Sequence, residues 1–108
     1  MPHYMLQAAY TAEAWAAQIK NPQNRVAHIR SAVEKLGGKI ETAYYTFGEY
    51  DLVAIAQFPD NVSASAFSLA AAAGGAVKAI KTTPLMTMDE GIAAMKKASG
   101  AGYRPPGG

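Results

Sequence analysis

The feature that most restricts the fold of this chain is a pair of strand-like segments, residues 39–47 (KIETAYYTF) and 50–58 (YDLVAIAQF). Only Gly48 and Glu49 separate them. A two-residue connection with glycine first is typical of a tight β-hairpin, because glycine adopts positive φ without steric cost. The sequence therefore predicts that these two strands pair in antiparallel fashion, with Asp51 directly after the turn.

The turn also assigns side chains to faces, because directly opposed residues of a hairpin share a face of the sheet. With Gly48-Glu49 as the turn, Thr46 opposes Asp51. One face then carries Ala43, Tyr45, Phe47, Tyr50, Leu52, Ala54, Ala56 and Phe58. The other face carries Ile40, Thr42, Tyr44, Thr46, Asp51, Val53, Ile55 and Gln57.

The run from Leu52 to Ala56 is apolar on both of these faces. A sheet that is covered on one side only shows alternation of apolar and polar residues instead. Helices of the same chain can cover only one face, and an exposed apolar patch of this size usually marks an interface. We therefore expect a homodimer, or a larger homo-oligomer, in which two sheets pack face to face.

The first 38 residues predict a strand followed by a helical crossover. Residues 4–10 are strand-like, and Thr11 is a good N-cap for a helix with Trp15 on its buried stripe, together with Ala12, Ala16 and Ile19. Asn21-Pro22 is expected to restart the helix, with Asn as cap and Pro at the first position. The next buried stripe consists of Val26, Ile29, Val33 and Leu36, and it ends at Gly37-Gly38.

Two arginines, Arg25 and Arg30, flank that second stripe, and His28 lies nearly opposite it. The arginines either cover the core with their aliphatic stems or point at an anion. His28 is expected to face solvent.

After the hairpin, the sequence predicts a helix, a strand and a last helix. Asp60 or Asn61 caps the first of these helices, which closes at Gly74-Gly75, and residues 76–83 form the fourth strand. Thr87 and Glu90 form a capping box for the last helix. One face of that helix carries Met88, Ile92 and Met95.

These elements define a fold class. The order β-α-β-β-α-β with an extra C-terminal helix is the ferredoxin-like α+β arrangement, a four-stranded antiparallel sheet with its two main helices on one face. Residues 1–99 are expected to form a single domain and residues 100–108 a flexible tail.

Composition excludes several classes of protein. The chain has 108 residues, which suits one domain, and a net charge of +2 with scattered basic residues, which argues against nucleic acid as a partner. It has no cysteine, and no apolar run approaches the roughly 18 residues that a membrane span needs. The first residues lack the pattern of a signal peptide. A cytoplasmic protein without membrane contact is expected.

The second face of the hairpin is a candidate ligand site, because it places a few polar groups among aliphatic side chains. The expected ligand-binding residues are Gln7, Thr42, Tyr44, Thr46 and Gln57. For catalysis, Asp51 is the candidate proton acceptor, with His3 as another, and Tyr44 the candidate oxyanion donor. Asp51 has a structural alternative as well, in which its carboxylate accepts hydrogen bonds from Thr46 or from the turn amides.

The run Tyr44-Tyr45-Thr46-Phe47-Gly48-Glu49-Tyr50-Asp51, after Gly37-Gly38 and a strand, resembles the GYD domain family of small bacterial proteins. The resemblance extends from about residue 3 to residue 98, and Thr82-Thr83-Pro84-Leu85 is part of it. In this chain Glu49 separates the glycine from the tyrosine and aspartate. The resemblance implies a dimeric α+β barrel, in which ferredoxin-like subunits pair their sheets. That superfamily includes enzymes, ligand-sensing domains and proteins without known activity, so the fold alone does not assign a reaction.

Three roles are left open by the residues: a module that binds a small molecule between paired sheets, a cofactor-independent isomerase or monooxygenase, and a structural oligomerisation module. No phosphate-binding loop or catalytic triad is present in the sequence. His3 and His28 lack the spacing of a metal or haem site, so no metal and no cofactor are expected.

Overall fold

The computed structural model describes residues 1–107 and has the expected α+β architecture. The elements follow in the order β1 (His3–Tyr10), α1 (Ala12–Lys20), α2 (Val26–Lys35), β2 (Lys39–Tyr45), β3 (Leu52–Gln57), α3 (Asn61–Ala73), β4 (Val77–Leu85) and α4 (Met88–Ala98). The four strands form one antiparallel sheet in the order β2-β3-β1-β4. This confirms the β-α-β-β-α-β order, with two helices in place of one in the first crossover.

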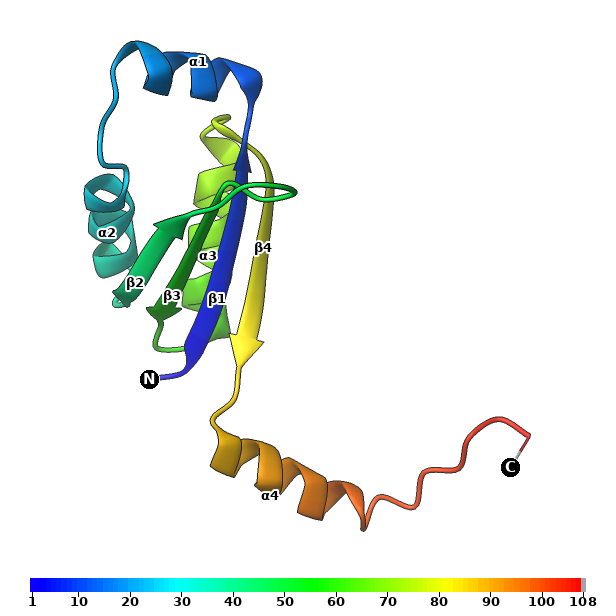
Figure 1. Cartoon of the computed structure of the whole chain (residues 1–108). Coiled ribbons are helices and arrows are strands. Elements are labelled where there is room, and N and C mark those ends of the chain that lie inside the picture. Colours follow the sequence, from blue (N-terminus) through cyan, green and yellow to red (C-terminus); the bar gives the residue numbers. More distant parts are fainter. Residues whose placement is uncertain (108) are drawn as a thin grey trace.

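The sheet has one covered face and one open face. Helices α2 and α3 lie on one side of it, and the side nearest the viewer in Figure 1 carries no helix. Helix α1 lies across one end of the sheet, whereas α4 projects from the opposite end. The principal extents of 57 × 33 × 22 Å reflect this projecting arm.

The hydrophobic core lies between the sheet and the helices. Phe58 and Val33 are fully buried there, and the ring of Phe58 packs edge-on against Tyr4 with centroids 5.7 Å apart. Gly38 is required at the end of the first crossover, because a Cβ on it would lie 2.5 Å from the carbonyl oxygen of Gln57. The hydroxyls of Ser68 and Thr82 share a hydrogen bond that links α3 to β4.

The hairpin has the predicted register next to its turn. Tyr45 pairs with Leu52, and the backbone N–H of Thr46 donates to the carbonyl of Asp51 over 2.8 Å. Gly48 has a φ of +116°, which suits the turn position assigned to it. The regular strands end at Tyr45 and begin again at Leu52, so each is two residues shorter at the turn than predicted.

Ile40 lies on the opposite face from the one predicted. The register of β2 against β3 shifts between Ile40 and Thr42, so that Ile40 pairs with Ala56. A β-bulge of this kind inserts one residue and turns the following side chains over. Ile40 is consequently buried under the helices, with 3% of its surface exposed, and the open face loses one aliphatic side chain.

The first crossover also differs from the prediction. Asn21 closes α1 by donating its backbone N–H to Ala17, and α2 begins only at Val26, whose N–H donates to the Asn24 side chain over 3.0 Å. The prediction that Asn21-Pro22 starts a helix is therefore wrong: the N-cap residue of α2 is Arg25, and its side chain makes no capping hydrogen bond.

The predicted buried stripe of α1 is wrong as well. None of its residues is buried, and Ile19 is 75% exposed, since α1 crosses the end of the sheet instead of lying on its face. The fourth strand runs to Leu85, two residues beyond its predicted end.

Helix α4 begins with the predicted capping box, in which Thr87 and Glu90 satisfy each other's backbone N–H groups. Met88 and Met95 on its apolar stripe are 87% and 71% exposed. This helix contributes little to the core of its own chain.

Candidate functional site

A cavity of about 250 Å³ lies between the covered face of the sheet and helices α2 and α3. Its walls are mostly aliphatic or aromatic, and two residues carry polar groups, Tyr10 and Arg25. The full lining consists of Leu6, Ala8, Tyr10, Arg25, Ile29, Leu52, Ala54, Phe67, Ala70, Ala71, Gly74, Ala76, Val77 and Ile80.

Small side chains leave this space unfilled. Ala8 and Ala54 stand on the sheet, and Ala70, Ala71 and Gly74 face them from the end of α3. In a tightly packed interior a wall of this kind meets larger side chains from a neighbouring helix. Here α1 crosses the end of the sheet instead of lying on the covered face, so it does not fill the space next to α2 (Figure 1).

Tyr10 and Arg25 mark the polar end of the cavity. Together with Ala76 they also line a hollow of about 160 Å³ beneath α1, which is otherwise formed by Ala14, Ala17 and Gln18. Because the same residues line both spaces, the cavity and the hollow adjoin at this point.

Burial raises the pKa of the Tyr10 hydroxyl, and the neighbouring Tyr45 adds to the rise, while the guanidinium of Arg25 opposes it. The hydroxyl is consequently a neutral hydrogen-bond donor at physiological pH. Arg25 is half-buried, and the one ion pair within residues 1–107 joins His3 to Glu41, so Arg25 has no carboxylate partner among them.

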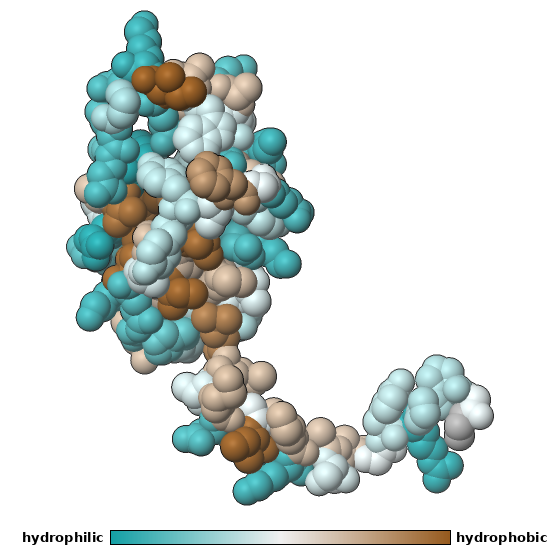
Figure 2. Space-filling view, in the orientation of Figure 1, coloured by the Kyte–Doolittle hydropathy of each residue, from teal (hydrophilic) through white to brown (hydrophobic). Residues whose placement is uncertain are grey.

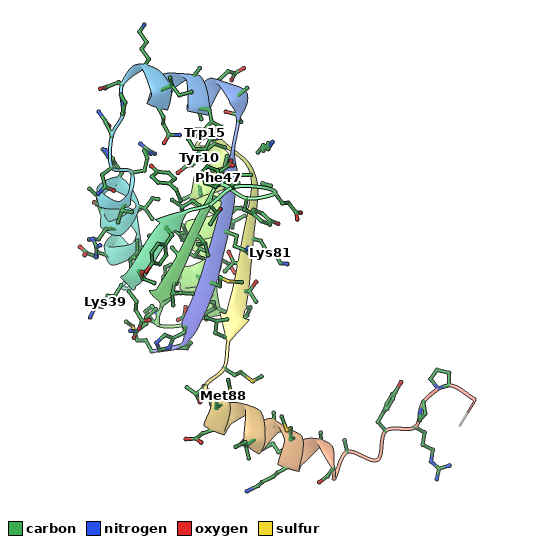
Figure 3. The ribbon with its side chains drawn as sticks, in the orientation of Figure 1. Tyr10, Trp15, Lys39, Phe47, Lys81 and Met88 are labelled. Atoms are coloured by element: carbon green, nitrogen blue, oxygen red, sulfur yellow. The ribbon has the colours of Figure 1, made fainter. Side chains whose placement is uncertain are left out.

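Asp51 lies at the same end of the sheet, where it connects three elements. Its carboxylate accepts from the backbone N–H of Tyr10 over 2.9 Å and from the indole N–H of Trp15 over 3.2 Å. Its own N–H donates to Ala8. Trp15 packs edge-on against Tyr10, with ring centroids 5.3 Å apart, and both lie near the upper end of the sheet in Figure 3.

These contacts give Asp51 a structural role with partners other than those predicted. Thr46 donates its hydroxyl to the carbonyl of Tyr50 over 2.7 Å instead of to Asp51. The carboxylate turns toward β1 and α1, and both of these hydrogen bonds go to its Oδ2 atom. Its use as a proton acceptor stays a prediction.

The open face brings together part of the predicted ligand set. Tyr44 pairs with Val53, Val53 with Gln7, and Gln7 with Lys81, so these residues form one row across the sheet. Thr42 belongs to the adjoining row, next to Ile55. Tyr44 is 66% exposed, so without a second chain this row does not enclose a pocket.

Gln57, the last predicted ligand residue, lies at the far end of the open face. Its amide donates to Glu41 over 2.6 Å, and His3 lies 2.9 Å from the same carboxylate oxygen. The hydrogen bond from Gln57, and the hydrogen bond and charge of His3, hold the pKa of Glu41 below its usual value. The structure therefore separates Gln57 from Tyr44 and gives it a local partner.

Among the residues that the structure describes, no group of three or more His, Cys, Asp or Glu side chains is placed to hold a metal ion. His28 is exposed, as expected. None of the helices within residues 1–107 is both long and apolar enough to span a bilayer.

The cavity on the covered face was not predicted from the sequence. The alanines of residues 70–73 indicate close packing of α3 on the sheet, and that interpretation does not include a void. The cavity is identified by small residues on both of its walls. The sequence does not give this signal, because it does not show that Ala8 and Ala54 line the same space as Ala71. For Arg25 the sequence allows two interpretations, a side chain that points at an anion or one that covers the core.

Comparison with solved structures identifies chains with the same fold. TTHA0845 from Thermus thermophilus has a TM-score of 0.52 and 17% identity, over 81% of this chain and 95% of that one. The hypothetical protein PHS023 from Pyrococcus horikoshii has a TM-score of 0.51 and 12% identity, over 81% and 92%. FFRP-DM1 has a TM-score of 0.50 and 14% identity, over 80% and 100%. At these identities the likeness concerns the fold alone.

No curated protein matches the sequence. The family model of the GYD domain matches residues 4–95, which include the four strands except for His3, and most of α4. This confirms the resemblance carried by the hairpin, and the chain belongs to the GYD domain family.

Proposed function

We propose that this protein binds a small, largely apolar molecule in the cavity between the covered face of the sheet and helices α2 and α3. The observation that carries the proposal is the cavity itself, whose walls are apolar and which has its polar groups at one end. Ligand pockets in proteins have this composition, with few polar groups on mostly hydrophobic walls.

The size of the cavity limits the ligand. Its volume of about 250 Å³ lies just below the usual range of roughly 300–1,000 Å³ for ligand pockets. An engineered cavity of about 150 Å³ in another protein takes up benzene. The space here therefore suits one ring, or a short chain, with a few further atoms.

We also propose that the protein is a homo-oligomer, with the open face as its interface. The support is the mixture of aliphatic and polar side chains on that face, which Figure 2 shows as brown among teal and pale side chains toward the viewer. Met5, Val53 and Ile55 stand there without any helix over them. A second copy of the chain would cover them, and it would also enclose Gln7, Thr42 and Tyr44 between two sheets.

Binding is tested by NMR titration of the backbone amides with 3-phenylpropan-1-ol and 3-phenylpropionate. We expect saturable shifts at Ala71, Gly74 and Val77 with at least one of the two compounds. The substitution Ala71→Leu should abolish them, because leucine fills the cavity without disturbing a helix. Ala73→Leu is the matched control, since Ala73 is exposed on the same helix and outside the lining.

Three outcomes contradict this assignment. Saturable shifts at Gln7, Tyr44 and Val53 would place the ligand between paired sheets. The absence of saturable shifts with both compounds, or shifts that persist in Ala71→Leu, would exclude the cavity as the binding site.

A further inference from the structure

We propose that the ligand of the covered-face cavity is a small carboxylic acid, whose carboxylate binds Arg25 and the Tyr10 hydroxyl while its hydrocarbon part fills the apolar space. This inference rests on the proposed binding function and names its ligand class. It depends on the distribution of donors and acceptors around the cavity.

The polar side chains at the cavity are donors. The guanidinium of Arg25 carries five N–H groups and no acceptor, and the neutral phenol of Tyr10 can donate its proton. The other twelve lining residues have only aliphatic, aromatic or glycine side groups. A ligand that suits both the polar end and the apolar part of the cavity must therefore combine a hydrogen-bond acceptor with an apolar body.

The charge of Arg25 determines the kind of acceptor. No carboxylate in the described part of the chain pairs with this half-buried arginine. The nearby Asp51 directs its carboxylate to the N–H groups of Tyr10 and Trp15. An anionic ligand would supply the missing counter-charge, because ion-paired hydrogen bonds to arginine are stronger and shorter than neutral ones.

A carboxylate suits this site better than a phosphate monoester. The planar fork of a guanidinium matches the two oxygens of a carboxylate in a bidentate geometry. A phosphate monoester carries between one and two negative charges at neutral pH and three acceptor oxygens. Arg25 is the only cationic residue that lines the cavity, so one positive charge is available for one negative charge.

The position of the donors gives the ligand an orientation. Tyr10 and Arg25 stand where the cavity adjoins the hollow beneath α1, whereas the buried residues Ala8, Ala54 and Phe67 line the cavity and not the hollow. The carboxylate would lie at this junction, close to water, while the hydrocarbon part enters the space between sheet and helices. A buried charge without such access would cost far more.

The test compares three compounds that share a phenyl ring: 3-phenylpropionate, the neutral 3-phenylpropan-1-ol and phenyl phosphate. Binding is followed by the NMR shifts of Ala71 and Gly74 and by the fluorescence of Trp15. Trp15 is the only tryptophan of the chain and it packs against Tyr10. We expect 3-phenylpropionate to bind at least about tenfold more tightly than the alcohol, since charge-assisted hydrogen bonds are the stronger ones.

Variants then assign the preference to its residues. Arg25→Gln should weaken binding of the acid far more than binding of the alcohol, and so remove the preference for the acid. Arg25→Lys should retain part of it, and Tyr10→Phe should weaken acid binding by a factor of about three to ten, the value of one hydrogen bond. Arg30→Gln is the matched control, because Arg30 is exposed on the same helix and does not line the cavity.

Three results would overturn the inference. Equal affinities for the acid and the alcohol would show that the site does not recognise a carboxylate. Tighter binding of phenyl phosphate would show that the site prefers a phosphate. A preference for the acid that survives in Arg25→Gln would show that this arginine does not cause the preference. Failure of the proposed function is distinct, because then neither the acid nor the alcohol produces shifts that Ala71→Leu abolishes.

Discussion

Strand β3 carries aliphatic side chains on both faces of the sheet, and the two faces have different surroundings. On the covered face Ala56 and Phe58 have no exposed surface, because α2 and α3 pack over them. On the open face Val53 and Ile55 are only half-buried, by their neighbours in the sheet. One chain thus completes one hydrophobic layer, on the covered face, and leaves Val53 and Ile55 of the open face half-buried.

The covered face is also incomplete at one end. Its lower half is a packed core around Phe58, whereas its upper half contains the cavity beside Tyr10 and Arg25. Helix α1 does not cover the upper half, because it crosses the end of the sheet. The same face therefore serves stability at one end and, in our proposal, recognition at the other.

The largest effect is expected from Phe58→Ala. The ring is fully buried against Tyr4 and Phe67, so its removal leaves a cavity. The free energy of unfolding should fall by about 3–5 kcal/mol, as measured by urea denaturation. Phe47→Ala, at a fully exposed ring of the turn, is the control and should change the same quantity by less than about 0.5 kcal/mol. Similar losses in both variants would show that burial does not distinguish these positions.

A smaller loss is expected from Asp51→Ala. This change leaves the N–H groups of Tyr10 and Trp15 without their acceptor, which should lower the free energy of unfolding by about 1–3 kcal/mol. The emission of Trp15 should shift as well, because its indole loses a charged partner. Glu49→Ala, two residues away at an exposed turn position, is the control. An unchanged stability in Asp51→Ala would contradict the structural role.

On the open face, Ile55→Lys should change assembly more than stability. A charge in the middle of the proposed interface opposes pairing of two sheets, while the free energy of unfolding of one chain changes by no more than about 1 kcal/mol. Size-exclusion chromatography with light scattering should detect a shift from the oligomer toward the chain mass of 11.3 kDa. Val62→Lys, on the exposed side of α3, should leave the oligomer intact. A wild-type protein that is already monomeric would contradict the proposed oligomer.

The smallest effect concerns the cluster of His3, Glu41 and Gln57 at the end of the open face. Since the pKa of Glu41 is lowered in the folded state, its contribution is complete above the ordinary glutamate value of about 4.3 and disappears as the pH falls through the lowered value. The stability difference between wild type and Glu41→Gln should therefore shrink as the pH is lowered through this window. A difference that is independent of pH in acid denaturation curves would contradict this interpretation.

The hairpin illustrates how far the sequence leads. Gly48-Glu49 and the alternation beside it predict the pairing of Tyr45 with Leu52, because a two-residue turn sets the register. The position of Ile40 could not be predicted in this way, because the β-bulge after it adds one residue and no local sequence pattern indicates a bulge there. Thr42 and Tyr44 lie on the open face as predicted, because this part of the hairpin register is correct. Gln7 lies beside them because it pairs with Val53.

The path of the first crossover could not be predicted from the sequence either. Asn21-Pro22 is a good helix start by local rules, yet Asn21 ends α1, and α2 begins five residues later. Trp15 on α1 packs against Tyr10 and Tyr45 and donates to Asp51, and the last two residues are distant in sequence, so local rules do not describe the contacts of α1.

By itself, the sequence determined the order of the elements, the antiparallel hairpin, the capping box of α4 and the family. Periodicity, turn residues and caps act over a few residues, so local reasoning reaches them. Only the tertiary structure decided that α1 crosses the end of the sheet and that small residues from β1, β3 and α3 meet around a cavity next to Arg25. These features arise from contacts between residues far apart in the chain, where packing outweighs local preference.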